Sequence, residues 1–116
     1  MSVTEVDCGA LFVYGSLLDE ARRAELIGRK VATAPARLAG YERRRGRYFY
    51  IVERVGAETT GLMLSGLGER DFALLDRYEE VPRLYTRVKV EVASAGGVAL
   101  RCWIYLPTQA LLGPGD

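Results

Sequence analysis

Hydrophobic and polar positions follow two patterns along the chain, short strand-like runs and longer segments with helical spacing. Residues 10–14 (ALFVY) form a continuous apolar run, which predicts a strand buried on both faces. Residues 85–93 alternate between mostly valine positions and charged or aromatic positions, which predicts a strand with one face in the core. Residues 94–97 (SAGG) then predict a hairpin turn, and residues 98–106 its returning strand.

Three further segments predict strands in the middle of the chain. Residues 31–40 look extended but contain Pro35, which is typical of an edge strand or a bulge. Residues 48–54 are aromatic and β-branched, and residues 61–67 are apolar. The glycine and polar residues at positions 56–60 predict a turn between these two strands.

Two segments predict helices. Asp19 is a suitable N-cap for a helix over residues 20–27, and Gly28 suits the position just past its end. A second helix is expected over residues 69–80, because Pro82 disfavours helical geometry at the residue before it. About six strands and two helices without a βαβ rhythm predict the α+β class, with a mixed sheet curled into a small β-barrel and helices packed outside.

Length and charge narrow the class of protein. The 116 residues predict a single domain over residues 1–116, with a flexible tail over about residues 108–116. The formal net charge of +1 argues against a nucleic-acid partner or a membrane surface. No segment has transmembrane length and no signal peptide is visible, so a cytoplasmic location is expected. Cys8 and Cys102 have neither metal nor redox spacing.

The chain contains no histidine. This absence excludes Ser-His-Asp and Cys-His nucleophile systems and the usual zinc and iron ligand sets. We therefore expect no metal and no cofactor. If the protein catalyses proton transfer near neutral pH, a carboxyl group with a shifted pKa is the natural candidate.

Glu79 is the carboxyl group best placed for that role. On a helical wheel it projects about 20° from Phe72 and about 40° from Leu75, on the apolar face of the second predicted helix. Burial and the negative end of the helix dipole both favour its protonated form, which predicts a raised pKa. The alternative is that Glu79 is a salt-bridge partner of one of the nearby arginines.

Two other segments carry weaker signals. Residues 15–18 (GSLL) link a buried strand to a helix, and successive backbone N–H groups there form an anion-binding concavity in some proteins. Residues 43–47 (RRRGR) are the only basic cluster, which is either a phosphate or carboxylate patch or a solvated turn. The near-neutral charge of the chain favours the solvated turn.

Three short motifs together resemble the gamma-glutamylcyclotransferase-like family, especially its short branch with the gamma-glutamylamine cyclotransferases. They are VYGSL at residues 13–17, LDRYE at residues 75–79 and YTR at residues 85–87, and the likeness covers roughly residues 11–107. The resemblance implies a small mixed β-barrel with peripheral helices. One departure is Glu80, which stands where the family usually has glycine.

The resemblance also implies a reaction and a site. The expected activity is a cofactor-free gamma-glutamyl cyclotransferase: the substrate α-amine attacks its own γ-amide and releases 5-oxoproline and an amine. The implied catalytic residue is Glu79, and the implied substrate-binding residues are Tyr14, Gly15, Ser16, Leu17, Tyr85 and Tyr105. The implied partner is a small gamma-glutamyl molecule, whose leaving amine stays open, as does the oligomeric state. The alternatives are a non-catalytic module that binds an amine or gamma-glutamyl compound, and a protein-interaction domain.

Overall fold

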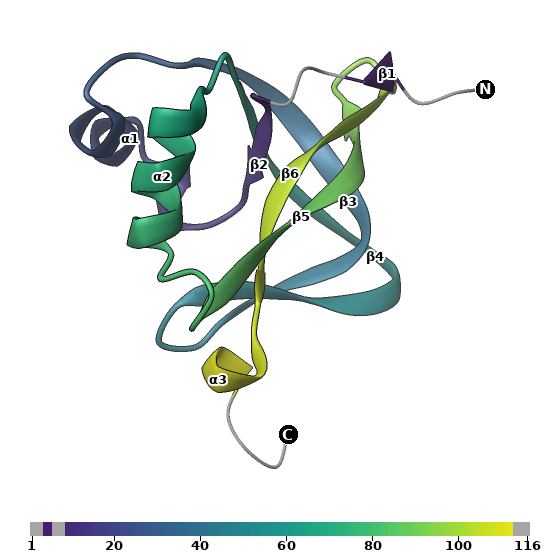
Figure 1. The fold of residues 1–116 in the computed structure, drawn as a ribbon. Coiled ribbons are helices and arrows are strands. Elements are labelled where there is room, and N and C mark those ends of the chain that lie inside the picture. The colour runs from purple at the N-terminus through teal and green to yellow at the C-terminus, as the bar shows by residue number, and fades with distance from the viewer. Residues whose placement is uncertain (1–3, 6–8, 113–116) are drawn as a thin grey trace.

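The computed structural model describes residues 4–5 and 9–112. Along this part of the chain the elements follow in the order shown in Figure 1. They are β1 (Thr4–Glu5), β2 (Leu11–Val13), the 3-10 helix η1 (Ser16–Leu18), α1 (Glu20–Ile27), β3 (Ala32–Arg45), β4 (Phe49–Ser65), α2 (Glu69–Tyr78), β5 (Tyr85–Ser94), β6 (Ala99–Pro107) and α3 (Gln109–Leu112). None of the described helices is long and apolar enough to cross a membrane.

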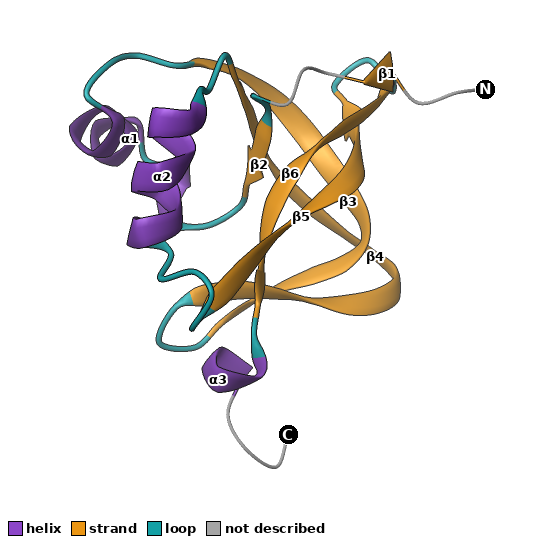
Figure 2. Ribbon diagram, viewed as in Figure 1, coloured by secondary structure: helices purple, strands orange, loops and turns teal. Residues whose placement is uncertain are grey.

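Five of the described strands close into a barrel in the order β6–β2–β4–β3–β5, with β5 pairing back to β6. The β2–β6 pair is parallel and the other pairs of the ring are antiparallel, so the sheet is mixed. Strand β1 adds to β6 outside the ring as a parallel partner. Helices α1 and α2 lie together on one side of the barrel (Figure 2). The predicted α+β class, a mixed β-barrel with peripheral helices, is confirmed.

Alternation along β2 divides the hydrophobic core into two clusters. Leu11 and Val13 belong to a cluster between the barrel and the two helices, whereas Phe12 belongs to a cluster drawn from all five barrel strands. All three residues of β2 are buried, as the continuous apolar run predicts. Cys102 is a free thiol in the interior cluster, where burial raises its pKa to about 11, and Cys8 lies outside the described residues.

Strands β3 and β4 form one long, curled antiparallel hairpin. The prediction of two strands at residues 48–54 and 61–67 is wrong, because residues 49–65 form the single strand β4. The turn predicted at residues 56–60 is a continuous part of that strand. Gly40 and Gly56 each have φ of +85°, and the β3–β4 register shifts next to Gly40. The glycines therefore bend the hairpin without ending it, as bulges do.

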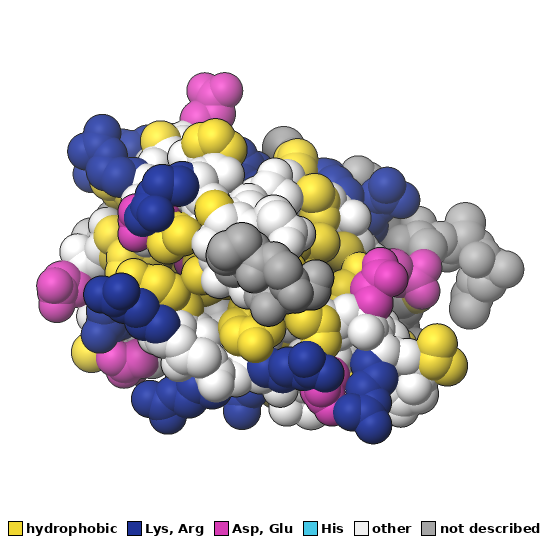
Figure 3. Space-filling view, turned by 90° about the horizontal axis from the view of Figure 1, so that it is seen from below, with side chains coloured by type: hydrophobic (Ala, Val, Ile, Leu, Met, Phe, Trp, Pro, Cys, Tyr) yellow, Lys and Arg dark blue, Asp and Glu magenta, His cyan; other side chains and the backbone are white. Residues whose placement is uncertain are grey.

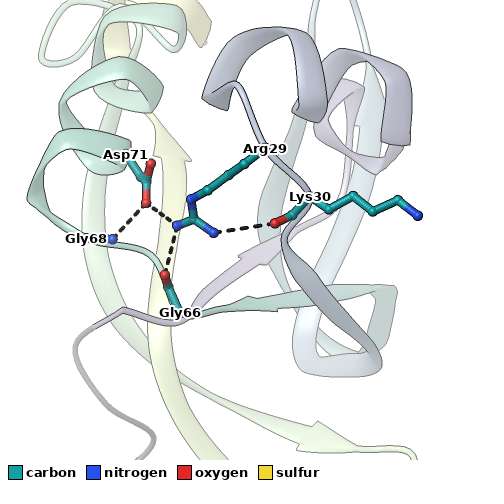
Figure 4. Close-up of polar contacts among 5 residues, drawn as sticks. All are labelled: Arg29, Lys30, Gly66, Gly68 and Asp71. Atoms are coloured by element: carbon teal, nitrogen blue, oxygen red, sulfur yellow. Dashed lines mark hydrogen bonds and ion pairs between the residues drawn. The ribbon is translucent and has the colours of Figure 1, made fainter.

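The N-terminus of α2 is anchored by Asp71 (Figure 4). Its carboxylate accepts a hydrogen bond from the N–H of Gly68 at 2.9 Å and pairs with Arg29 at 2.6 Å. Arg29 also donates to the carbonyl oxygen of Gly66 at 3.0 Å. Burial opposes ionisation of Asp71, but the Gly68 hydrogen bond and Arg29 outweigh it and hold the pKa of this carboxyl below its ordinary value. These contacts fix where α2 begins and hence where its other end lies.

The remaining differences from prediction concern the ends of elements. Helix α1 has the predicted bounds and Gly28 follows it with φ of +87°, but the side chain of Asp19 makes no capping hydrogen bond. Residues 109–112 form α3 where an irregular tail was expected. The N–H of Thr108 donates to the carbonyl oxygen of Leu84 at 2.8 Å, which attaches this segment to the start of β5. The rest of the predicted tail, residues 113–116, lies outside the described residues.

Candidate active site

A cavity of about 440 Å³ opens at the end of the barrel where α2 ends. The loop from β3 to β4, the C-terminal end of α2 and the start of β5 lie together there (Figure 1). Every residue that the resemblance assigns to the site lines this cavity: Tyr14, Gly15, Ser16, Leu17, Glu79, Tyr85 and Tyr105. Their roles stay predictions, but the fold brings them together from distant parts of the chain.

One side of the cavity is formed by the turn that begins at Gly15. A single 3-10 turn, Ser16–Leu18, follows it and links β2 to α1. A Cβ atom on Gly15 would lie 2.9 Å from Cβ of Phe49, so this close approach requires glycine. Arg23 of α1 is only 6% exposed and donates to the last two carbonyl oxygens of the turn, at 2.8 and 2.9 Å. The first N–H groups of such a helix have no partner within it, and here they belong to residues that line the cavity.

Tyr78 connects this turn to α2 and was not singled out from the sequence. Its hydroxyl lies 2.8 Å from Oγ of Ser16, and Arg22 of α1 donates to the same hydroxyl at 3.2 Å. The signal available in the sequence was its position next to Glu79 in the LDRYE motif. Through these contacts both helices hold the turn in place beside the cavity.

Helix α2 ends at Tyr78, two residues earlier than predicted. The N–H groups of Glu80 and Val81 donate to carbonyl oxygens three and five residues back, at 3.1 and 2.9 Å, which is the Schellman pattern. Glu80 has φ of +55°, the left-handed conformation that this pattern requires and that glycine adopts most easily. The left-handed backbone thus explains why glycine suits the position of Glu80. Glu79 is the cap residue between the helix and this turn.

Glu79 is half-buried, and burial raises its pKa from 4.5 to about 7. Within residues 9–112 its carboxylate forms neither an ion pair nor a hydrogen bond. The alternative of a salt bridge to a nearby arginine is not what the structure shows, because Arg83 pairs with Glu80 and Arg87 pairs with Asp76. A partly buried carboxyl group without a cation beside it is shifted toward its neutral form.

Three tyrosines surround the same space and each donates its hydroxyl to the protein. Tyr14 donates to the carbonyl oxygen of Tyr105 at 2.6 Å, and Tyr85 donates to the carbonyl oxygen of Phe49. Tyr105 donates to Asp76 at 2.6 Å. Burial raises the pKa of all three phenols well above the ordinary value, so they are neutral. With their protons committed, their oxygen lone pairs are available as acceptors for a ligand.

Asp76 and Arg87 hold Tyr105, one of these three tyrosines, in position. Arg87 donates twice to the Asp76 carboxylate, at 3.0 and 3.2 Å, and its guanidinium lies 4.4 Å from the ring centres of both Phe72 and Trp103. Asp76 and Arg87 belong to two of the motifs on which the resemblance rests, but no role was predicted for either residue. Their pairing joins α2 to β5, and the Tyr105 hydrogen bond adds β6.

The basic cluster at residues 43–47 is the loop and strand end that joins β3 to β4. The favoured interpretation, a solvated turn, is incomplete, because Arg45 and Arg47 line the cavity, as does Arg22 of α1. Seen from below, Lys and Arg side chains stand at many points around the margin of this face, with Asp and Glu side chains between them, and hydrophobic side chains lie farther in (Figure 3). The cluster of arginines before an aromatic strand was the available signal, but its orientation depends on the curl of the hairpin.

The geometry agrees with comparisons to known proteins. The family model described as "Gamma-glutamyl cyclotransferase, AIG2-like" matches residues 11–114. The chain belongs to the gamma-glutamyl cyclotransferase, AIG2-like family. A solution structure of an Arabidopsis thaliana protein has a TM-score of 0.78 at 26% identity, covering 88% of this chain and 70% of that one. A structure named gamma-glutamyl cyclotransferase has a TM-score of 0.77 at 23% identity, covering 86% and 66%, which shows the shared fold.

A curated relative from Methanocaldococcus jannaschii is 28% identical over 99 residues. Its name assigns it gamma-glutamylcyclotransferase activity and, provisionally, an RNase activity. The match covers 83% of this chain but only 45% of the relative, so this chain spans about half the length of that protein.

Proposed function

We propose that the protein is a cofactor-free gamma-glutamyl cyclotransferase, which converts a gamma-glutamyl compound into 5-oxoproline and an amine. The observation that carries the proposal is Glu79, a carboxyl group with a pKa of about 7 that faces a cavity walled by neutral tyrosines. A group with this pKa takes up and returns a proton near neutral pH. Membership of the family and the name of the archaeal relative support the same reaction.

In the proposed reaction the substrate α-ammonium gives a proton to Glu79, and the free amine attacks the γ-carbonyl carbon of the same molecule. The new C–N bond closes the lactam ring and places charge on the carbonyl oxygen. The bond to the departing amine then breaks. Two protons leave the attacking nitrogen in all, and both finish on the departing amine as an ammonium ion, the first by way of Glu79. Because one substrate contains both reacting groups, holding it folded supplies much of the acceleration.

The other cavity residues have roles consistent with this chemistry. Backbone N–H groups of the turn at Gly15–Leu17 are the donors we assign to the oxyanion, since such donors stabilise charge that develops in the transition state. The oxygen atoms of Tyr14, Tyr85 and Tyr105 accept hydrogen bonds from substrate N–H groups, because their own protons are already donated to the protein. The wall therefore orients the α-amine toward Glu79.

A non-catalytic binding module is the competing function. It would use the same cavity, with the ionised form of Glu79 paired to a ligand amine. The role of Glu79 distinguishes the two functions, because only the catalysed reaction requires its carboxylate to take up and release a proton. A binding module predicts ligand affinity without the release of 5-oxoproline.

The test is 5-oxoproline release from a panel of gamma-glutamyl amines and gamma-glutamyl amino acids, using the wild type and Glu79→Gln. We expect release by the wild type and a loss of about 10²–10⁴-fold in kcat for the variant, the usual contribution of a general acid–base. Glu58→Gln, which neutralises an exposed carboxylate of β4, is the matched control and retains activity. Turnover that survives Glu79→Gln would remove Glu79 from the mechanism, and no release from any compound would favour the binding module.

A further inference from the structure

The wall of the cavity carries an excess of positive charge. Arg22, Arg45 and Arg47 all line it, and within residues 9–112 none of the three forms an ion pair with a carboxylate. The acidic residues among the lining are Glu79 and Glu80. Glu79, with a pKa of about 7, carries only part of a negative charge at neutral pH, and Glu80 is already paired with Arg83. The cavity is therefore electrostatically suited to a ligand with a negative charge.

The positive charge lies at the outer part of the cavity. All three arginines are exposed, whereas the tyrosines Tyr14 and Tyr105 at the reacting end are buried and Glu79 is half-buried. A substrate with its α-amine at Glu79 therefore extends toward the exposed part with the group attached to its γ-amide. That group is the leaving amine of the proposed reaction.

Two of these arginines are held by aromatic rings of the same hairpin. The guanidinium of Arg45 lies 5.0 Å from the ring centre of Phe49, and that of Arg47 lies 5.9 Å from the ring centre of Tyr48. Both aromatic residues also line the cavity. A cation–π contact limits the freedom of a guanidinium while leaving its N–H groups able to donate to a planar acceptor.

We propose that Arg45 and Arg47 form a subsite for a carboxylate on the leaving amine, so that the preferred substrates are gamma-glutamyl amino acids or peptides with a free carboxylate. This inference rests on the proposed function, because the reaction defines which part of the ligand faces the arginines. A polyamine would instead place a further ammonium group beside the same guanidinium groups. Like charges repel there, and the leaving amine would offer the arginine donors no acceptor.

A matched pair of ligands isolates the carboxylate. Gamma-glutamyl-alanine and gamma-glutamyl-ethylamine differ only in that group, because ethylamine is alanine without its carboxylate. Their dissociation constants are measured by calorimetry on Glu79→Gln, which binds without consuming them. We expect about tenfold tighter binding of the alanine compound, equivalent to a charge-assisted hydrogen bond. Adding Arg45→Gln and Arg47→Gln brings the two constants within about twofold, whereas adding Arg101→Gln, an exposed arginine of β6 outside the cavity, preserves the preference.

The inference is overturned by equal affinities for the two ligands, by a preference that survives loss of both arginines, or by the binding of neither ligand. Turnover by the wild type decides the proposed function separately. Release of 5-oxoproline from both compounds with equal kcat/KM would keep the cyclotransferase and remove the carboxylate subsite. Release from neither would remove the cyclotransferase, while the ratio of dissociation constants would still decide the subsite.

Discussion

The hydroxyl of Tyr105 lies 2.6 Å from Oδ1 of Asp76 and donates a hydrogen bond to it. Because Arg87 donates to the same carboxylate, one acidic group on α2 holds β5 and β6 in position. Glu79 is the cap residue at the end of α2, three residues after Asp76, so these contacts also set where Glu79 lies. The two motifs that contain Asp76 and Arg87 thus meet in a structural role beneath the candidate active site.

We expect Asp76→Asn to lower the free energy of unfolding by about 1–3 kcal/mol, because Arg87 and Tyr105 donate to both carboxylate oxygens, whereas an amide is uncharged and has only one acceptor oxygen. Urea denaturation of the variant and the wild type measures the change. Asp19→Asn is the matched control, since the Asp19 side chain makes no capping hydrogen bond. Equal losses in the two variants would show that the network contributes nothing specific.

The left-handed backbone at Glu80 predicts a difference in stability between the glycine and alanine variants at this position. Both Glu80→Gly and Glu80→Ala remove the exposed ion pair with Arg83, which is worth little. Only glycine relieves the strain at φ of +55°, so Glu80→Gly should be more stable than Glu80→Ala by about 1 kcal/mol. Thermal unfolding of the two variants side by side tests this. If Glu80→Ala proves as stable as Glu80→Gly, the turn does not require the left-handed conformation.

Local signals in the sequence predicted the elements whose ends are set by nearby residues. Helix α1 has the predicted bounds because Gly28 accepts the left-handed conformation at its end, and β2 is buried on both faces as its apolar run indicates. The division of β4 failed because a glycine in a strand and a glycine in a turn look alike in sequence. Whether Gly56 bends or ends the strand depends on how the residues on either side of it pair with β3, which no local pattern contains.

The sequence likewise predicted part of the candidate site, namely the features that depend on local spacing. Helical spacing placed Glu79 on the apolar face, and its raised pKa agrees with that placement. The spacing did not predict which arginine pairs with which acid, because Arg87 reaches Asp76 only after β5 packs against α2. The part played by Arg45 and Arg47 was also missed, since it requires the β3–β4 hairpin to curl toward the end of α2.

Gly61 predicts a strong effect of a single methyl group. A Cβ atom there would lie 2.2 Å from the carbonyl oxygen of Val13, where β2 pairs with β4. Since backbone atoms cannot move aside cheaply, Gly61→Ala should cost about 2 kcal/mol or more of unfolding free energy. At Gly96 the nearest atom would be 3.9 Å away, so Gly96→Ala is the control with a small effect. A mild Gly61→Ala variant would mean that the β2–β4 contact is looser than described.

The raised pKa of Glu79 predicts how stability depends on pH. The carboxyl titrates at about 7 in the folded protein and near 4.5 when unfolded, so between these values the folded state binds more protons. Stability contributed by this group therefore falls as pH rises through that window and levels off above it. Glutamine does not titrate, so Glu79→Gln lacks this fall.

We expect the stability of Glu79→Gln relative to the wild type to increase by on the order of 2 kcal/mol between about pH 5 and about pH 8, a value discounted for the partial exposure of the side chain. Urea denaturation of both proteins across this range measures it, and the subtraction cancels groups common to both, such as Asp71. Parallel curves would mean that Glu79 titrates like an exposed carboxyl. Such a result would remove the physical basis for its role as a general acid–base near neutral pH, because a group with an ordinary pKa holds almost no proton there.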